Sequence, residues 1–171
     1  MKKNINPQAM QIAACLHDWL EYHVPSIKAC SKHTQRNYHI SMTLYAEFLR
    51  TVKGITPETL NANCFCKKNI EDWIVWMKKN RNCSPATCNV RLSALRAFLK
   101  YLSDCDISFV SVFLQAENVP NEKTPKRKVV GISKLAVDTL LSMPNQRTAI
   151  GFRDYMLMLL LYSTAVRINE L

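Results

Sequence analysis

Apolar residues recur at helical spacing in one segment of this chain after another, and this periodicity limits the fold more than any other feature. Only three glycines interrupt 171 residues, and hydrophobic residues make up 48% of the chain, so a folded, helix-rich protein is favoured over a disordered one. Ser31, Ser84 and Ser133 stand where helices would begin, which is typical of N-cap residues. The sequence therefore predicts an all-α fold.

The predicted helices are separated by residues that end or restart a helix. Gly54 provides a stop, and Ser84-Pro85 provides a cap followed by proline at the first helical position. The predicted spans are 9–22, 31–53, 68–79, 84–102, 107–116, 133–141 and a last helix from about residue 147.

Periodicity is lost after residue 117, where prolines and a basic cluster appear. This composition predicts a linker. We therefore predict a first domain over residues 1–118, a basic linker over 119–130 and a second part over 131–171. The basic cluster of this linker is expected either to follow a phosphate backbone or to act as a soluble hinge. Its DNA-binding candidates are Lys126, Arg127 and Lys128.

Charge indicates the kind of partner. Lys and Arg number 23 against 13 Asp and Glu, which leaves a net charge of +10. Such a surplus favours an anionic partner, most commonly nucleic acid, although a merely basic soluble protein stays an alternative. The opening residues are polar and the strongest apolar run, 156–161, is far too short for a membrane span, so we expect a cytoplasmic protein with no membrane partner.

Seven cysteines are an odd number without a disulfide-scaffold pattern, and we expect reduced, mostly buried thiols. Cys64 and Cys66, with Cys83 and Cys88, have poor spacing for a tetrahedral zinc site. No metal and no cofactor are predicted.

Two predicted helices carry polar stripes suited to DNA. No acid occurs from residue 84 to 103, and the capped start of that helix is able to approach a phosphate. A similar pattern begins 53 residues earlier, where Ser31-Lys-His-Thr34 parallels Ser84-Pro-Ala-Thr87. An ordinary solvated face is the alternative for both stripes. The candidates are Lys32, Thr34 and Arg36 on the earlier helix and Ser84, Thr87, Asn89, Arg91, Ser93, Arg96 and Lys100 on the later one.

The last segment places an arginine after an apolar helix that is expected to be buried. Arg167 follows the run 156–161, and Glu170 stands three residues further on, where it would hold the guanidinium. This arrangement suits a fixed phosphate clamp, with a plain surface ion pair as the alternative. Tyr155 and Tyr162 lie in the apolar helix itself and are predicted to be core residues.

Two stretches resemble the tyrosine recombinases, the phage-integrase family, in an Xer-like form. Residues 84–102 resemble the last long helix of that family's core-binding domain, a SAM-like bundle of four or five helices, and residues 153–171 resemble the first box of its catalytic domain. The resemblance implies that Arg167 is the first catalytic arginine and that Glu170 helps to position it. Ala165 departs from the glycine usual in that box.

The resemblance also implies a function. Family members integrate and recombine DNA, often of mobile elements, through a 3′-phosphotyrosyl intermediate, with double-stranded DNA and other recombinase protomers in a synaptic complex as partners. The family's lysine, His-x-x-Arg box and tyrosine nucleophile lie downstream of the matched region. We therefore expect the chain as given to be inactive in cleavage. A truncated DNA-binding regulator that occupies recombinase sites and a helical protein-interaction module are the alternatives.

Overall fold

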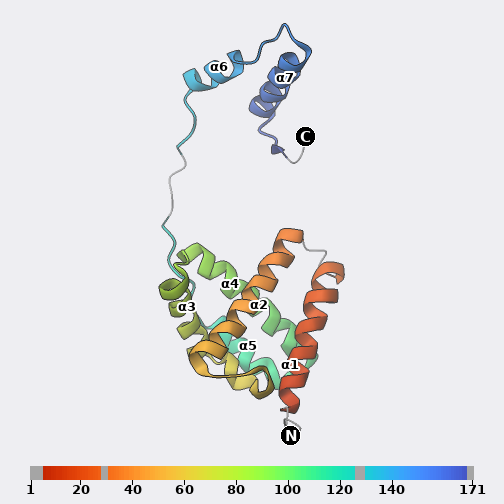
Figure 1. The fold of residues 1–171 in the computed structure, drawn as a ribbon, viewed down its shortest axis with the longest axis vertical. Coiled ribbons are helices and arrows are strands. Elements are labelled where there is room, and N and C mark those ends of the chain that lie inside the picture. The colour runs from red at the N-terminus through yellow and green to blue at the C-terminus, as the bar shows by residue number, and fades with distance from the viewer. Residues whose placement is uncertain (1–5, 28–30, 126–129, 169–171) are drawn as a thin grey trace. The chain divides into compact units, whose positions relative to one another are not determined.

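The computed structural model of the chain describes residues 6–27, 31–125 and 130–168 (Figure 1). Within these ranges the secondary structure is entirely helical, with no strand, so the predicted all-α fold is confirmed. The chain divides into two compact units, Met1–Pro125 and Lys126–Leu171. Each unit is described by itself.

The first unit is a helical bundle. Its elements match the predicted helices to within a few residues, except that the first helix gives way to a π-helical stretch containing Pro25. Its α-helices are α1 (Pro7–Asp18), α2 (Lys32–Lys53), α3 (Lys67–Arg81), α4 (Pro85–Cys105) and α5 (Val110–Glu117); its other turns are the π-helical Trp19–Ile27 and the 3₁₀ turns Pro57–Thr59, Ala62–Phe65 and Ile107–Phe109.

The ends of α2 and α4 follow from their capping residues. Ser31 Oγ accepts the Thr34 N–H at 3.3 Å, and Ser84 Oγ accepts the Thr87 N–H at 3.2 Å, so both helices begin with the same local geometry. Gly54 ends α2 with a φ of 67°, a left-handed conformation that costs glycine little.

Helix α4 is the centre of the bundle and contacts α1, α2, α3 and α5 (Figure 1). Its inward face is fully buried, as the helical spacing predicted. Trp19 stacks on Tyr38 with ring centroids 4.8 Å apart and meets Phe98 of α4 at 5.5 Å. The buried residues of α4 are Cys88, Leu92, Ala94, Leu95, Phe98, Leu99 and Leu102.

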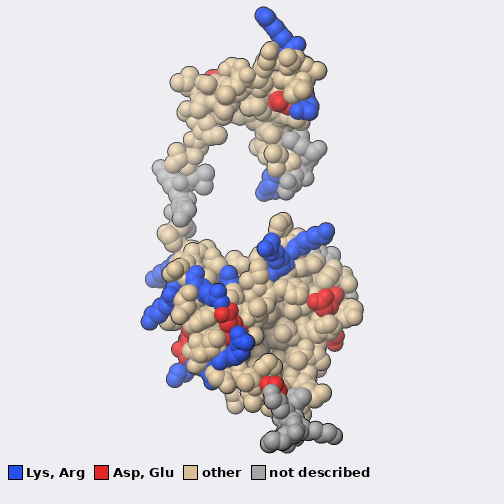
Figure 2. Space-filling view, viewed as in Figure 1, with Lys and Arg blue, Asp and Glu red and all other residues tan. Residues whose placement is uncertain are grey.

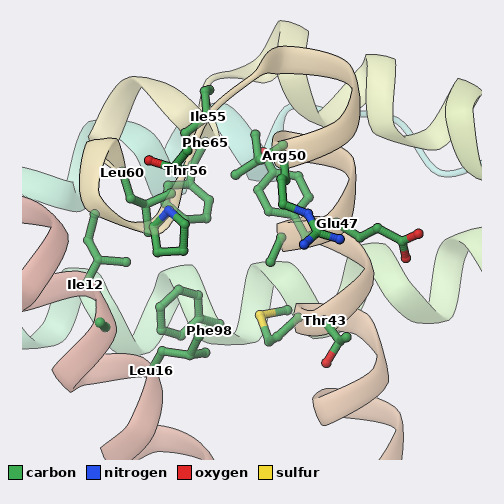
Figure 3. Close-up of a pocket in the computed structure, with 16 residues that line it drawn as sticks. Ile12, Leu16, Thr43, Glu47, Arg50, Ile55, Thr56, Leu60, Phe65 and Phe98 are labelled. Carbon is green, nitrogen blue, oxygen red and sulfur yellow. The ribbon is translucent and has the colours of Figure 1, made fainter.

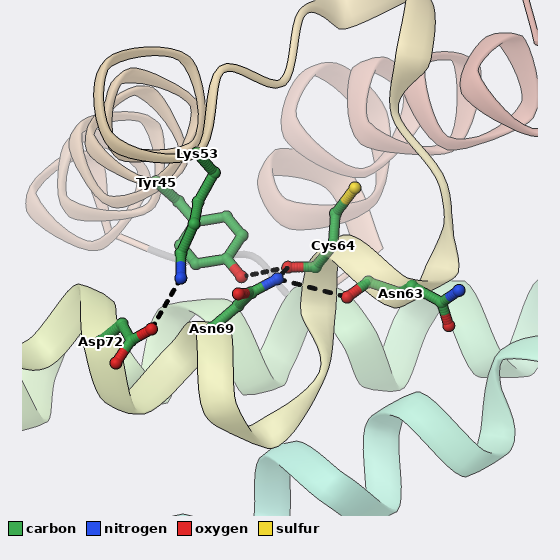
Figure 4. Close-up of polar contacts among 6 residues, drawn as sticks. All are labelled: Tyr45, Lys53, Asn63, Cys64, Asn69 and Asp72. Atoms are coloured by element: carbon green, nitrogen blue, oxygen red, sulfur yellow. Dashed lines mark hydrogen bonds and ion pairs between the residues drawn. The ribbon is translucent and has the colours of Figure 1, made fainter.

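A small polar cluster fixes the turn before α3 (Figure 4). The Tyr45 hydroxyl donates to the Cys64 carbonyl at 2.7 Å, and Asn69 Nδ2 donates to the same oxygen at 3.2 Å. Burial raises the pKa of Tyr45 well above its usual value, so this phenol stays a donor. Lys53 and Asp72 pair at 2.6 Å and join α2 to α3.

The first residues of the predicted linker pack against α4. Val119 is buried, and the Asn89 amide exchanges two hydrogen bonds with the Glu122 backbone, at 2.9 and 2.8 Å. The Glu122 carboxylate also pairs with Lys78 at 2.9 Å. Residues 119–122 therefore belong to the first unit.

The second unit contains α6 (Lys134–Ser142) and α7 (Ala149–Thr164), capped by Ser133 and Thr148. The predicted burial of α7 is wrong in this unit: Met156, Leu157 and Leu160 are 47%, 42% and 44% exposed. Two short helices enclose too little volume to cover an apolar helix on all sides.

The tyrosines of α7 differ from their predicted place for the same reason. Tyr162 is exposed and Tyr155 is half-buried, so neither is a core residue of the second unit.

Among the helices that the structure describes, none combines the length and apolarity that a bilayer crossing requires.

Candidate nucleic-acid interface

Helix α2 carries a line of polar residues along its outer side. Lys32, Arg36, His39 and Thr43 are spaced at helical intervals and are all exposed; we call them the α2 stripe. In the described part of the chain no acid pairs with Lys32 or Arg36, whereas His39 Nε2 lies 3.7 Å from Glu21 Oε1. The predicted basic residues of this helix therefore face solvent.

The α2 stripe leads into a groove of about 540 Å³ between α2, the end of α3 and the start of α4. We call it the α2–α4 groove. Two arginines and one glutamate supply its charge. Its lining residues are His39, Ile40, Thr43, Leu44, Glu47, Arg81, Cys83 and Arg91.

Arg91 has the most unusual environment in this groove. Its Nη1 atom is buried, and within the described residues it has no hydrogen-bond partner. A buried guanidinium nitrogen without an acceptor costs about 1–3 kcal/mol, so native proteins seldom leave one. Because Arg91 lines the groove, its positive charge would attract an anion that enters there.

Arg81 is a groove residue that the sequence reasoning missed. Its Nη2 lies 2.5 Å from both carboxylate oxygens of Glu47, and its guanidinium lies 5.5 Å from the centre of the Trp76 ring. The available signal was the basic run 78–81 at the end of a predicted helix, directly before the Ser84 cap.

The predicted polar stripe of α4 is only partly a surface. Arg96, whose side chain is 16% exposed, donates to the Ala116 carbonyl and the Asn121 side chain at 3.0 Å each, and also to the Val119 carbonyl. With Asn89, it fastens residues 116–122 to the bundle. The prediction of Asn89 and Arg96 as open DNA contacts is not supported by this geometry, because α5 and the following segment cover that side of α4.

Lys100 and Ser93 are exposed, as expected of the stripe. The Lys100 ammonium, however, pairs with Asp104 at 2.8 Å, four residues further along α4, and lies 5.7 Å from the Phe113 ring centre. The segment without acidic residues, 84–103, ends one residue before Asp104, so the sequence stripe did not include this partner.

The hydroxyls that were predicted to contact DNA at the helix starts bond to one another. Ser31 Oγ lies 3.0 Å from Thr34 Oγ1, and Ser84 Oγ lies 2.9 Å from Thr87 Oγ1. Their first role is to cap α2 and α4. A DNA contact by Thr34, Ser84 or Thr87 stays a prediction.

Basic side chains gather over the N-terminal end of α2 and over α3 and the start of α4 in Figure 2. Both areas adjoin the α2 stripe and the α2–α4 groove. The linker candidates Lys126, Arg127 and Lys128 lie outside the described residues.

Arg167 follows the end of α7. Ala165 ends this helix with φ 54° and ψ 22°, and its N–H donates to the Leu161 carbonyl at 3.0 Å. This left-handed conformation explains physically why glycine suits the position. Arg167 is exposed just beyond it, and Glu170 lies outside the described residues.

A second cavity, also about 540 Å³, opens between α1, α2 and residues 55–65 (Figure 3). Ile12, Leu16, Leu60 and Phe98 make it strongly apolar. Its few polar lining residues include Thr43, Glu47, Arg50 and Thr56. Across the described ranges, no three His, Cys, Asp or Glu residues converge as metal ligands.

The cysteines are less buried than predicted. Of the described thiols, Cys64 and Cys88 are buried and Cys105 is exposed. Cys15, Cys66 and Cys83 are intermediate, and Cys30 lies outside the described residues.

Comparison with known proteins shows which family this helical bundle belongs to. Residues 16–104, which include α2, α3 and nearly all of α4, match the family described as phage integrase, N-terminal SAM-like domain. The chain belongs to the phage-integrase family of tyrosine recombinases. The α2–α4 groove therefore lies inside the part of the recombinase that defines its membership.

Individual recombinases are similar over most of the chain. Tyrosine recombinase XerC of Chlamydia muridarum is 29% identical and that of Chlamydia caviae 26% identical, each over 171 aligned residues that include 92% of this chain and 53% of the relative. The chain thus spans about half the length of these relatives. No solved structure gives a significant match.

Proposed function

We propose that the first unit is the DNA-binding part of a site-specific tyrosine recombinase and that duplex DNA lies against the α2 stripe and the α2–α4 groove. Lys32 and Arg36 would contact phosphates along one side, and Arg91 would meet a phosphate at the groove. Backbone contacts of this kind hold a protein on duplex DNA in a fixed register. The net charge of +10 supports the proposal.

The unpartnered Arg91 nitrogen carries this proposal. A purely structural arginine would have an acceptor within the bundle, as Arg96 has. Arg81 and Glu47 in the same groove neutralise each other, so Arg91 is the groove's uncompensated cation. A phosphate at the groove would balance the charge of the Arg91 guanidinium.

We propose further that Arg167 serves as the first catalytic arginine of the complete recombinase. Its guanidinium would stabilise negative charge on the non-bridging oxygens of the scissile phosphate while a tyrosine forms the 3′-phosphotyrosyl bond. Glu170 would position this arginine. The 171-residue chain is inactive in cleavage by this proposal, because the resemblance assigns the nucleophile to a segment beyond the matched boxes.

The domain limits belong to the same proposal. The core-binding domain expected over 1–118 extends to residue 122, because residues 119–122 pack against the bundle, so the basic linker expected over 119–130 shortens to about 123–130. The start of a catalytic domain follows over 131–171. Integration of mobile DNA in the cytoplasm, in a complex with further recombinase protomers, is the proposed setting. XerC proteins, the similar relatives, are named as recombinases.

Fluorescence anisotropy with a labelled duplex tests the groove directly. Arg91→Gln and Arg36→Gln should each weaken binding by about fivefold or more at 100 mM salt, because each removes one phosphate contact. Arg91→Gln should leave the melting temperature unchanged or higher, since it removes an unsatisfied buried cation.

Lys68→Gln is the matched control. It removes the same charge from an exposed position at the other end of α3 from Arg81, and binding should change by less than about twofold. Equal losses in all three variants would show that binding follows net charge alone and would refute the groove as the site.

A further inference from the structure

Helix α1 and the π-helical turn after it contact the last turns of α4. Gln11 Nε2 donates to Asp106 Oδ2 at 2.7 Å at one end of this contact. At the other end the rings of His23 and Tyr101 lie 4.7 Å apart. These two contacts fix the register between the helices.

Two thiols meet between these contacts. Cys15 lies one turn after Gln11 on the same face of α1, and Cys105 immediately precedes Asp106. The Cys105 thiol lies next to the Cys15 thiol and next to the Tyr101 hydroxyl. Cys105 is exposed and Cys15 is half-buried.

We propose that Cys15 and Cys105 are an oxidation site that forms a reversible disulfide between α1 and the end of α4. Nothing in the DNA-binding role requires these thiols. The contacts on both sides keep this end of α4 against α1 and the turn after it, and the closeness of the two thiols is what a disulfide first requires.

The other described cysteines lack this arrangement. Cys64 and Cys88 are buried, and the Cys64 sulfur accepts the Asn61 N–H at 3.4 Å. Cys66 shares one tight turn with Cys64. Only the Cys15–Cys105 pair, among the residues described, joins two helices and includes an exposed sulfur.

A low-molecular-weight disulfide such as oxidised glutathione is the oxidant. The exposed Cys105 thiolate attacks one glutathione sulfur, the S–S bond of glutathione breaks, and one glutathione thiolate leaves. Cys15 then attacks the mixed disulfide at Cys105 and releases the second glutathione. Two protein thiols are oxidised, one glutathione disulfide is reduced to two thiols, and the protons of the cysteines pass to the glutathiones.

Burial and nearby charges set the rate at which Cys15 attacks the mixed disulfide. Burial, then Cys105, and then the carboxylates of Asp18 and Asp106 raise the pKa of the Cys15 thiol. Because the thiolate is the nucleophile, disulfide closure should accelerate as pH rises toward that pKa and should slow about tenfold per unit as pH falls below it. Tyr101 is the remaining titratable group that faces the pair.

Tryptic mapping without reduction tests the site in the full chain. Each cysteine lies alone in its tryptic peptide, residues 4–28 and residues 101–123. After treatment with oxidised glutathione at pH 8, we expect these two peptides to be cross-linked in most chains. The oxidised protein should also melt at least about 5 °C higher, because the bond closes the long loop between residues 15 and 105.

Two variants make the test selective. Cys66→Ser should retain both the cross-link and the thermal shift, whereas Cys105→Ser should lose both. Absence of the 4–28 to 101–123 cross-link, with glutathione attached singly to Cys105 instead, would overturn the proposal. A cross-link found only between chains, as a dimer on a non-reducing gel, would overturn it as well.

Discussion

Glu47 is the one acid in the α2–α4 groove, and its carboxylate is held by Arg81. Glu47→Gln should tighten duplex binding about threefold or more at low salt, because it removes a negative charge near the DNA and releases Arg81 toward a phosphate. The fold should persist, since partly exposed ion pairs contribute little to stability. Anisotropy and a thermal melt check both expectations; weaker binding with an intact fold would contradict the proposed path of the DNA.

The left-handed backbone conformation of Ala165 leads to a prediction about stability. A non-glycine residue in the left-handed region costs about 1 kcal/mol or more, so Ala165→Gly should stabilise the end of α7 by about 1 kcal/mol. Amide hydrogen exchange over residues 158–164 should then slow by about fivefold. Ala149→Gly, at the first position of the same helix, is the control and should not slow amide exchange over residues 158–164.

The sequence predicted the residues that act on nearby backbone, but it did not predict hydrogen bonds between residues far apart in the chain. Ser31, Ser84 and Gly54 act on backbone within a few residues, so their roles as caps and stop were predicted correctly. Arg96 has the right spacing for an outward stripe, but its acceptors lie twenty or more residues away in the chain. Only the folded bundle brings them together.

At the scale of elements, α4 and the segment after α5 form one structural piece. Arg96→Ala should destabilise the first unit by about 2–3 kcal/mol and lower its melting temperature by about 10 °C, because it removes the donor that Arg96 supplies to the carbonyls of residues 116, 117 and 119. Circular dichroism melts measure this. The sequence placed Arg96 on an outward polar stripe, where loss of the side chain would cost the fold little.

Lys100→Ala is the matched comparison on the same helix. Its pair with Asp104 is exposed on both sides, so the loss should stay below about 0.5 kcal/mol. Equal stability of the two variants would show that the contacts of Arg96 do not hold residues 116–122.

The element pattern itself followed from periodicity, because each helix of the bundle buries one face against α4. The prediction failed for α7. Its apolar residues suit a buried helix, yet burial depends on neighbouring elements, and the second unit supplies only α6 within the described residues. A sequence window cannot reveal whether enough partners surround a helix.

At the scale of the whole molecule, the proposed function assigns to this chain the DNA-binding part of a recombinase and one arginine of its chemistry. With a nicked suicide substrate the 171-residue chain should form no covalent protein–DNA adduct, because electrostatic stabilisation by Arg167 has no nucleophile to assist. A protein extended through the family's tyrosine should form an adduct that Arg167→Ala abolishes. A covalent band on a denaturing gel with the 171-residue chain alone would contradict the proposed division of roles.

The salt dependence of duplex affinity tests the central claim most directly. If Lys32, Arg36, Arg91 and their neighbours neutralise several phosphates, the logarithm of the association constant should fall linearly with the logarithm of salt, with a slope of about −0.9 per phosphate and a loss of about tenfold or more between 50 and 200 mM. Arg91→Gln should reduce that slope by about one unit, and Lys68→Gln should not. No binding at 50 mM salt, or an affinity indifferent to salt, would contradict the account.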